Sequence, residues 1–339
     1  MKVLITGCGR HSKSLVESLK HNPDGERVEI IGINNNPDNI LRVSVDKSII
    51  APSITAPDYI QWLYNLCETE KVDVVLPYIT AELPIVANAQ DYLEESGAKI
   101  SVSSPESLRV ANDKIALAEY FGDVMPRQMV VTSSEEIRHF ARKIGYYKDT
   151  KLCCKLADKC GGTGFAILDE HKYLDINTFG KIGVPRYMSI EQLCEIADKL
   201  NVKIILQEYI PGTDYSVCVL ADHGKMVYEC GFAGYTMEFG AVTSGEILKN
   251  KKAYEIAERA VKFLELDGNC CFDFIIKENG DAVLLECNPR LNATLPFVEA
   301  AGAPLAYYRC KQLLGGKLPK TLDINYGLKM VKYYESYYY

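Results

Sequence analysis

The sequence has 339 residues, 47% of them hydrophobic, and carries a formal net charge of -7 with a pI ≈ 5.4. Length and apolar content together predict about two or three domains with cores of their own and exclude extended disorder. The acidic balance gives no basic face for a nucleic-acid backbone, so we expect no nucleic-acid partner.

The chain shows no sign of export or membrane insertion. Its N-terminal apolar run is too short for a leader peptide, and no stretch approaches the roughly 18 apolar residues of a membrane helix. The 12 cysteines include no C-x-x-C pair, and several lie in apolar, strand-like runs. This favours buried thiols in a reducing compartment over disulfides or zinc. We therefore expect a cytoplasmic protein without a membrane partner.

The first 105 or so residues alternate strand and helix patterns. Such a β-α-β order implies a parallel sheet covered on both faces. We expect strands at 3–6, 28–34, 72–76 and 99–102, a helix that places Leu15, Val16 and Leu19 on one side, and helices at 59–69 and 84–95.

A second unit follows at about 126–205. Ser104-Pro105-Glu106 starts a helix that we expect to run past residues 112–114 toward Phe121. The pattern then predicts a strand at 129–132, a helix at 135–145, a strand at 151–156, and a capping box at 189–192 that opens a helix to Leu200.

From residue 204 onward the predicted strands become long and antiparallel. We expect strands at 204–210, 214–221 and 225–232, a helix at 251–266, a hairpin at 269–288 and two short helices. A parallel domain followed by an α+β half is the predicted architecture.

The hairpin carries the clearest chemical signal. Asn279-Gly280 between two apolar runs predicts a two-residue loop with both residues at positive φ. With that loop, Asp273 faces Glu286 directly. Strand alternation puts Asn288 on the same face as Glu286.

Two opposed carboxylates repel each other by up to roughly 1 kcal/mol, and a cation between them removes that cost. Three oxygen ligands on one sheet face suit Mg²⁺. The alternative is an ordinary solvated polar face, with Phe272, Phe274 and Ile276 packing the other side in either case.

A candidate phosphate loop follows the strand that ends near Lys155. Gly161, Gly162 and Gly164 let backbone N–H groups approach phosphate oxygens, and Lys155 adds a positive charge. The alternative is a common glycine turn between strands. No Walker A pattern, G-x-x-x-x-G-K-[ST], occurs in the sequence.

A polar hinge ends the apolar strand that begins at residue 204. Backbone groups at Gln207, Glu208, Tyr209 and Ile210 suit an adenine edge, and Asp214 suits ribose hydroxyls. Without other features, an ordinary strand-turn-strand is the favoured interpretation of this segment.

Two charged residues follow predicted strands of the first domain. Arg10 and Glu82 lie on loops where open parallel sheets usually bind ligands, so we consider both as contacts to the acceptor substrate. The alternative for each is a surface charge or a helix-cap partner.

Two other functions fit the sequence less well. A nicotinamide-dependent oxidoreductase needs Gly or Ala where Ser12 stands and an acid where Asn34 stands, and both positions fail. A non-catalytic nucleotide-binding module would be favoured by a lost ligand, yet Asp273, Glu286 and Asn288 are all present.

In chain order these features resemble the ATP-grasp superfamily over nearly the whole chain. The most specific string is E-x-N-P-R at residues 286–290, which coincides with the hairpin register. Residues 1–110 look like the pre-ATP-grasp domain of the carbamoyl-phosphate synthase large subunit and its single-module relatives. The chain is about one such module, so a complete carbamoyl-phosphate synthase is not expected.

The resemblance implies a combined α/β and α+β fold. A parallel-sheet, Rossmann-like pre-ATP-grasp domain would span 1–110. An ATP-grasp N-terminal, or lid, subdomain would span 111–205, and a C-terminal subdomain with the Mg²⁺-binding hairpin would span 206–339.

The resemblance also assigns roles. Lys114 and Lys155 would bind ATP phosphates, with the glycines at 161, 162 and 164 as a lid. Residues 207–210 would hold adenine and Asp214 ribose. Asp273, Glu286 and Asn288 would hold Mg²⁺ or Mn²⁺, and Arg290 would steady the transferred phosphoryl group.

The implied reaction is that of a carbon–nitrogen ligase. Mg·ATP phosphorylates a carboxylate to an acyl phosphate, and an amine, or less often a thiol, takes the acyl group. The expected partners are these small molecules, and a homodimer is compatible with this interpretation. The segment at 170–188 is longer than relatives suggest, and the Tyr-rich C-terminus has no functional account.

Overall fold

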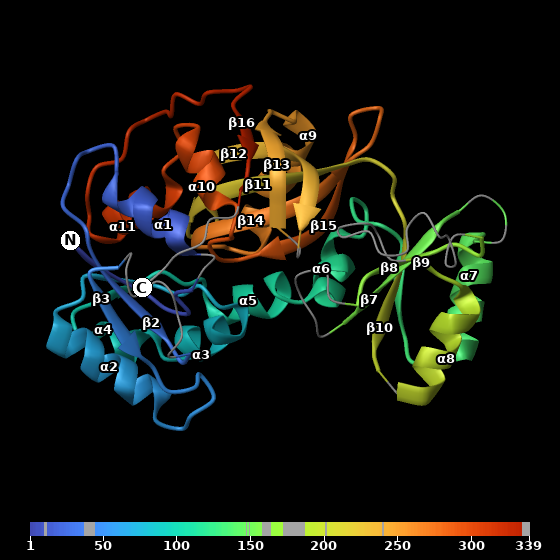
Figure 1. The fold of residues 1–339 in the computed structure, drawn as a ribbon, viewed down its shortest axis with the longest axis horizontal. Helices are drawn as coiled ribbons and strands as arrows, with labels where there is room; N and C mark the ends of the chain where they lie inside the picture. Colours follow the sequence, from blue (N-terminus) through green and yellow to red (C-terminus); the bar gives the residue numbers. More distant parts are fainter. Residues whose placement is uncertain are drawn as a thin grey trace.

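The structure, a computed structural model, describes residues 1–9, 12–36, 45–146, 148, 150–157, 164–171, 187–200, 202–238 and 241–333. Within these ranges the chain forms three sheets with helices packed on them (Figure 1). The predicted division into a parallel part and later mixed and antiparallel parts is confirmed. The predicted domain boundaries stay predictions.

The first sheet is parallel and has the strand order β3-β2-β1-β4-β5. The sequence analysis missed β3, which is short and mostly exposed and so lacks the apolar run of a central strand. The predicted helix at 84–95 is divided into α3 and α4 at Ala89. The elements are β1 Lys2–Ile5, α1 Lys13–Lys20, β2 Glu29–Asn34, β3 Lys47–Ile50, α2 Tyr59–Glu70, β4 Val74–Leu76, η3 Thr80–Glu82, α3 Leu83–Asn88, α4 Gln90–Glu94 and β5 Lys99–Ile100.

Two helices lead from the first sheet to the second: α5 Pro105–Ala111 and α6 Lys114–Phe121. Ser104 caps α5 as predicted, since its Oγ accepts from the backbone N–H of Ser107 at 3.2 Å. The expectation of one continuous helix through residues 112–114 is wrong. Asp113 is extended and caps a new helix, accepting from Ile115 N at 2.7 Å.

The second, or central, sheet has the order β6-β10-β7-β8-β9, and β10 runs antiparallel to both neighbours. Its buried face packs on α7 and α8. The predicted capping box is confirmed, because Ser189 and Gln192 exchange hydrogen bonds of 2.9 and 3.1 Å. The elements are β6 Gln128–Val131, α7 Ser134–Ile144, β7 Leu152–Leu156, β8 Ala166–Leu168, β9 Tyr187–Met188, α8 Ile190–Leu200 and β10 Ile204–Glu208.

The third sheet is antiparallel, with the order β15-β14-β11-β12-β13-β16. One face packs on α6 and α9 through side chains that include Phe272 and Phe274, as the alternation predicted. The opposite face packs partly on α1, α10 and α11 and carries the polar residues of the hairpin. The elements are β11 Thr213–Asp222, β12 Lys225–Glu238, β13 Ala241–Ile247, α9 Lys251–Phe263, β14 Gly268–Ile276, β15 Ala282–Asn288, α10 Leu295–Ala300, α11 Leu305–Leu313 and β16 Lys329–Val331.

In Figure 1, α5 and α6 run between the first domain and the central sheet, alongside the hairpin strands β14 and β15. The start of α6 therefore lies close to the end of β15 that carries Glu286. Cysteines in apolar strands, among them Cys153, Cys218 and Cys271, are buried free thiols, as expected.

Candidate active site

Asp273 and Glu286 are direct partners in the antiparallel pair β14–β15, as the sequence predicted. The predicted loop is wrong, however. Lys277 N donates to Asp281 O at 2.9 Å, and Gly280 N donates to Lys277 O at 2.8 Å, which makes a three-residue loop. Within that loop only Gly280 has positive φ, +82°. This is a type I turn closed by an αL glycine.

A second irregularity restores the predicted pairing. Phe274 pairs with Leu284 whereas Asp273 pairs with Glu286, so Leu285 is an extra residue in β15. The longer loop shifts the register by one residue and the bulge shifts it back. The carboxylates therefore face each other despite the wrong loop.

The Asp273 carboxylate accepts hydrogen bonds from two neutral side chains. Asp273 Oδ1 accepts from Ser216 Oγ at 2.6 Å, and Oδ2 accepts from Asn288 Nδ2 at 3.0 Å. Burial and the facing Glu286 carboxylate raise the pKa of Asp273 to about 7. A cation in this position would satisfy both carboxylates.

Asn288 lies between the two carboxylates. Its Nδ2 donates to Asp273 and also to Glu286 Oε1, at 3.2 Å, so an amide N–H occupies the position where positive charge is favoured. Rotation of the amide by half a turn would present Oδ1 as a third oxygen ligand. The set of two carboxylates and one amide oxygen fits the oxygen preference of Mg²⁺ or Mn²⁺.

Lys114, the first residue of α6, completes the charge arrangement. Its Nζ lies 2.8 Å from Glu286 Oε2. Burial alone would raise the pKa of Glu286, but the ammonium groups of Lys114 and Lys155 outweigh it and lower that pKa. The position of Lys114 beside Glu286 depends on the helix break at Asp113, because that break starts α6 beside β15.

Arg290 follows β15 and reaches the first domain. Its Nε donates to Thr80 Oγ1 at 2.7 Å and its Nη1 donates to Leu291 O at 2.8 Å. Its Nη2 approaches Asn288 Oδ1 at 3.4 Å. The guanidinium therefore lies beside the carboxylate clamp, by which we mean Asp273, Glu286 and Asn288.

Lys155 faces the clamp from the central sheet. It pairs with Ile205 of β10, and directly paired residues of an antiparallel ladder share a face. The Lys155 ammonium acts on the pKa of Glu286 and of Asp214, whose own pKa is raised by burial. The face with Lys155 is therefore turned toward the third sheet.

The predicted hinge lies at the end of β10. Gln207 is buried and pairs with Gln128 on one side and Cys153 on the other. Glu208 forms an ion pair with Arg127, at 2.9 Å. Tyr209 and Ile210 lie just past the strand end, and burial raises the pKa of Tyr209.

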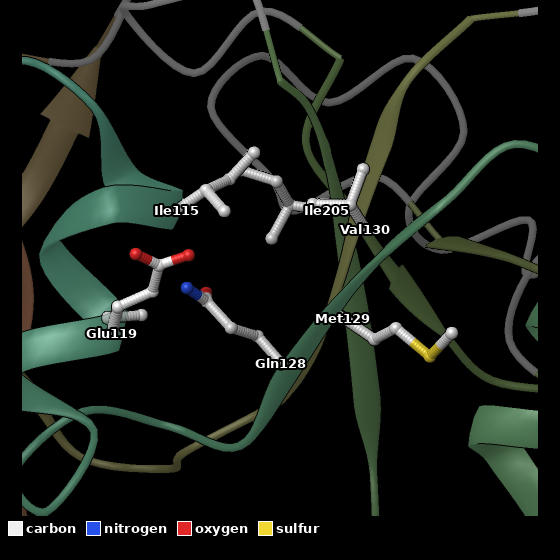
Figure 2. A pocket seen from close by; sticks show the side chains of 7 residues that line it. Ile115, Glu119, Gln128, Met129, Val130 and Ile205 are labelled. Carbon is white, nitrogen blue, oxygen red and sulfur yellow. The ribbon is translucent and has the colours of Figure 1, made fainter.

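A cavity of about 220 Å³ opens between α6 and the central sheet, where its lining includes Ile205, the ladder partner of Lys155. In Figure 2, Ile115 and Glu119 reach it from α6, while Met129 points away. The Gln128 side chain points toward Glu119, and its Nε2 donates to Lys114 O at 3.2 Å. The cavity wall thus also fixes the first turn of α6.

Glu82 is not brought into this group. It is fully buried, and its two oxygens accept from the hydroxyls of Thr6 and Tyr59. Direct contact with a substrate is therefore not favoured. Arg10, Gly161 and Gly162 lie outside the described residues, as does most of the 170–188 segment, while Gly164 is described and has φ +76°.

Two residues of the site escaped the sequence analysis. Ser216 lies opposite Asp273 in β11, two positions after Asp214, so strand alternation was a usable signal. For Thr80 the sequence offers no such signal, because its contact with Arg290 joins residues 210 positions apart.

Two family models match the chain. Residues 3–101 match the PylC-like N-terminal domain, and residues 201–335 match the ATP-grasp domain described from a biosynthetic pathway with the Ter operon. The segment that matches the ATP-grasp model includes the hairpin with Asp273, Glu286 and Asn288, so the chain is similar to ATP-grasp proteins over this part.

Over most of its length the chain is similar to part of the large chain of carbamoyl phosphate synthase. It is 24% identical to the arginine-specific large chain of Bacillus subtilis over 304 residues, covering 86% of this chain and 27% of that one. The chain thus spans about a quarter of the length of such curated relatives.

Solved structures share the fold. N5-carboxyaminoimidazole synthetase from Staphylococcus aureus, complexed with ADP, has a TM-score of 0.68 at 13% identity, covering 96% of this chain and 80% of that one. The biotin carboxylase domain of 2-oxoglutarate carboxylase from Hydrogenobacter thermophilus, with MgADP, ADP and bicarbonate, has a TM-score of 0.68 at 16% identity, covering 97% and 73%. The expected ATP and Mg²⁺ agree with these ligands.

The described part of the chain contains no helix that is both long enough and apolar enough to cross a membrane.

Proposed function

We propose that the chain is an ATP-dependent ligase that phosphorylates a carboxylate and transfers the acyl group to an amine, releasing ADP and phosphate. The observation that carries this proposal is the meeting of opposite charges at one point. Asp273 and Glu286 face each other, Lys114 lies 2.8 Å from Glu286, and Arg290 lies beside Asn288. Such a set suits phosphoryl transfer, which depends on positioning and charge neutralisation.

The nucleotide roles are part of this proposal. Lys114 and Lys155 bind phosphate oxygens from two sides, and Gly161, Gly162 and Gly164 cover them. The backbone of residues 207–210 receives the adenine, and Asp214 receives the ribose. The raised pKa of the half-buried Asp214 is consistent with a carboxyl that gains hydrogen-bond donors from a ligand.

The clamp would hold Mg²⁺, which when bound neutralises phosphate oxygens. A carboxylate oxygen of the substrate attacks the γ-phosphorus and the bond to the β-phosphate oxygen breaks. Arg290 donates to the equatorial oxygens as charge spreads over them. The amine then attacks the acyl carbon, and phosphate leaves with the oxygen that came from the carboxylate.

Substrate identity, assembly and location also remain proposals. We propose a small-molecule carboxylate and a small-molecule amine, a cytosolic location, and a homodimer as the assembly to be tested. The division at residues 110 and 205 is proposed as well, although the pairing of β10 through Glu208 assigns that strand to the central sheet.

The test is product analysis of the purified protein with Mg·ATP and pooled amino acids and small carboxylates. We expect ADP and phosphate from one pool, and with ¹⁸O in the carboxylate, one ¹⁸O atom in each phosphate. AMP with pyrophosphate would contradict the proposal. ATP binding without turnover in any pool would instead support a non-catalytic nucleotide-binding module.

A further inference from the structure

Arg290 is held from outside its own sheet. Its Nε lies 2.7 Å from Thr80 Oγ1, which belongs to the loop after β4 at the carboxyl edge of the first sheet. A charge-assisted hydrogen bond of this length fixes the plane of the guanidinium. The first domain therefore reaches the clamp through one hydroxyl group.

The bonds of Arg290 leave a defined part of the guanidinium available. An arginine carries five N–H donors. Nε is directed at Thr80, Nη1 at Leu291 O and Nη2 at Asn288 Oδ1. One further N–H on each terminal nitrogen is left for a planar, two-point contact with phosphoryl oxygens. Without the Nε bond, the side chain could rotate about its stem.

Hydrogen bonds hold the segment that carries Thr80 in place. Glu82, two residues later, is fully buried and accepts from Thr6 and Tyr59. Tyr78 N donates to Thr6 Oγ1 at 3.3 Å, and Glu82 N donates to Ile79 O at 3.0 Å. The loop from 77 to 82 is thereby tied to the end of β1 and to α2. This gives the buried Glu82 a structural role in the site without substrate contact.

We propose that Thr80 is a positioning residue that orients the Arg290 guanidinium for phosphoryl transfer, so that the first domain contributes to the chemistry without touching ATP. This rests on the proposed function for its kinetic consequence, but the contact itself can be measured without turnover. Glu82, Thr6 and Tyr59 act as the support of Thr80.

The first measurement is the ¹⁵N–¹H signal of the Arg290 Nε–H, assigned by its loss in Arg290→Lys. Thr80→Val keeps the shape of the side chain and removes the acceptor. We expect solvent exchange of this N–H to accelerate at least about tenfold in Thr80→Val and to stay unchanged in Thr80→Ser. Thr55→Val, at an exposed threonine that is hydrogen-bonded to Ser53 of its own turn, is the matched control.

The second measurement is steady-state ADP release in the same variants. We expect kcat to fall about tenfold to a hundredfold in Thr80→Val, with KM for Mg·ATP changed less than about threefold, and Thr80→Ser to recover most of the loss. A loss that falls on KM, or one that Thr80→Ser does not rescue, would overturn the positioning role.

The two measurements separate two failures. If the wild-type protein releases no ADP with any substrate, the proposed ligase function fails, and the exchange rates still decide whether Thr80 holds Arg290. If the wild type turns over and Thr80→Val matches Thr55→Val in both measurements, the positioning role fails and the ligase function stands.

Discussion

Lys114 Nζ lies 2.8 Å from Glu286 Oε2, so the first residue of α6 is tied directly to the metal-clamp strand β15. Both side chains are partly exposed, at 22% and 30%. A lysine expected to bind ATP phosphates thus also neutralises a carboxylate that would hold Mg²⁺. The affinity for ATP and the affinity for a divalent cation should therefore change in opposite directions when this lysine is removed.

The first prediction concerns Lys114→Met. Without the ammonium, a divalent cation no longer competes with Lys114 for Glu286, so Mn²⁺ should bind the nucleotide-free protein about threefold to tenfold more tightly, corresponding to about 1 kcal/mol. ATP should bind about tenfold to a hundredfold more weakly, because a charged hydrogen bond to phosphate is lost. Calorimetric titration of each ligand checks both signs. Weaker Mn²⁺ binding in the variant would show that Lys114 does not compete at the clamp.

The second prediction concerns Glu286→Gln. The substitution keeps the side-chain shape but removes a charge, so Mg²⁺-dependent ADP release should fall at least about a hundredfold. Stability should hardly change. Relief of carboxylate repulsion, up to about 1 kcal/mol, offsets loss of a partly exposed ion pair of similar size. Thermal unfolding without metal and ADP release with metal give the two numbers. Wild-type rates in a folded Glu286→Gln protein would remove the clamp from the mechanism.

The hairpin shows what the sequence could predict about this site. The opposition of Asp273 and Glu286 was predicted from an Asn279-Gly280 two-residue loop, yet the loop has three residues and β15 has a bulge at Leu285. The two shifts cancel. Alternation and pairing rules supply the chemistry-bearing face, whereas loop type depends on a balance of turn geometries that one dipeptide does not fix.

Contacts between segments far apart in the sequence are harder to predict from that sequence. The helical pattern predicts a continuous helix through Asp113, but an aspartate is a good N-cap, and the extended backbone of Asp113 starts α6 at Lys114. The bond between Thr80 and Arg290 has no local signature at all, because it depends on how the first domain packs against the third sheet. The periodicity of the sequence predicts the helices and strands, whereas a contact such as that between Thr80 and Arg290 depends on how those elements pack together.

The third prediction concerns Glu299, which is buried and whose Oε2 has no hydrogen-bond partner among the described residues. Ser18 and Ala306 N donate to it, and Tyr78 and Cys310 are its titratable neighbours. Burial raises the pKa of Glu299 from 4.5 to about 7. The folded protein therefore binds this proton more tightly than the unfolded chain.

The sign follows from that difference. Between pH 4.5 and about 7 the unfolded state loses the proton first, so the free energy of unfolding falls as pH rises. Glu299→Gln removes this fall, and the variant should gain about 1–3 kcal/mol relative to wild type at pH 8 compared with pH 4.5. Urea unfolding at both pH values measures it, with the exposed Glu17→Gln as control. A difference between variant and wild type that does not change with pH would contradict the assignment.

The last prediction concerns the buried ion pair between Arg309 of α11 and Asp267, which directly precedes β14. Arg309 is 2% exposed and contacts both oxygens of Asp267, at 2.5 and 3.1 Å, while its Nε donates to Ser101 Oγ at 3.1 Å. Arg309→Met leaves the Asp267 carboxylate without its cation and should reduce the free energy of unfolding by about 3–5 kcal/mol. Lys199→Ala, which breaks an exposed helical pair with Glu195, should cost only about 0.3–0.5 kcal/mol.

A double variant separates charge from packing in this pair. If the cost of Arg309→Met comes from the uncompensated carboxylate, adding Asp267→Asn should recover more than half of it, because the remaining polar groups are neutral. Guanidinium unfolding of the two single variants and the double variant gives the coupling energy. If the double variant is no more stable than Arg309→Met, the arginine stabilises the domain contact by filling space and by its bonds to Ser101 and Gln312, and the ion pair itself adds little.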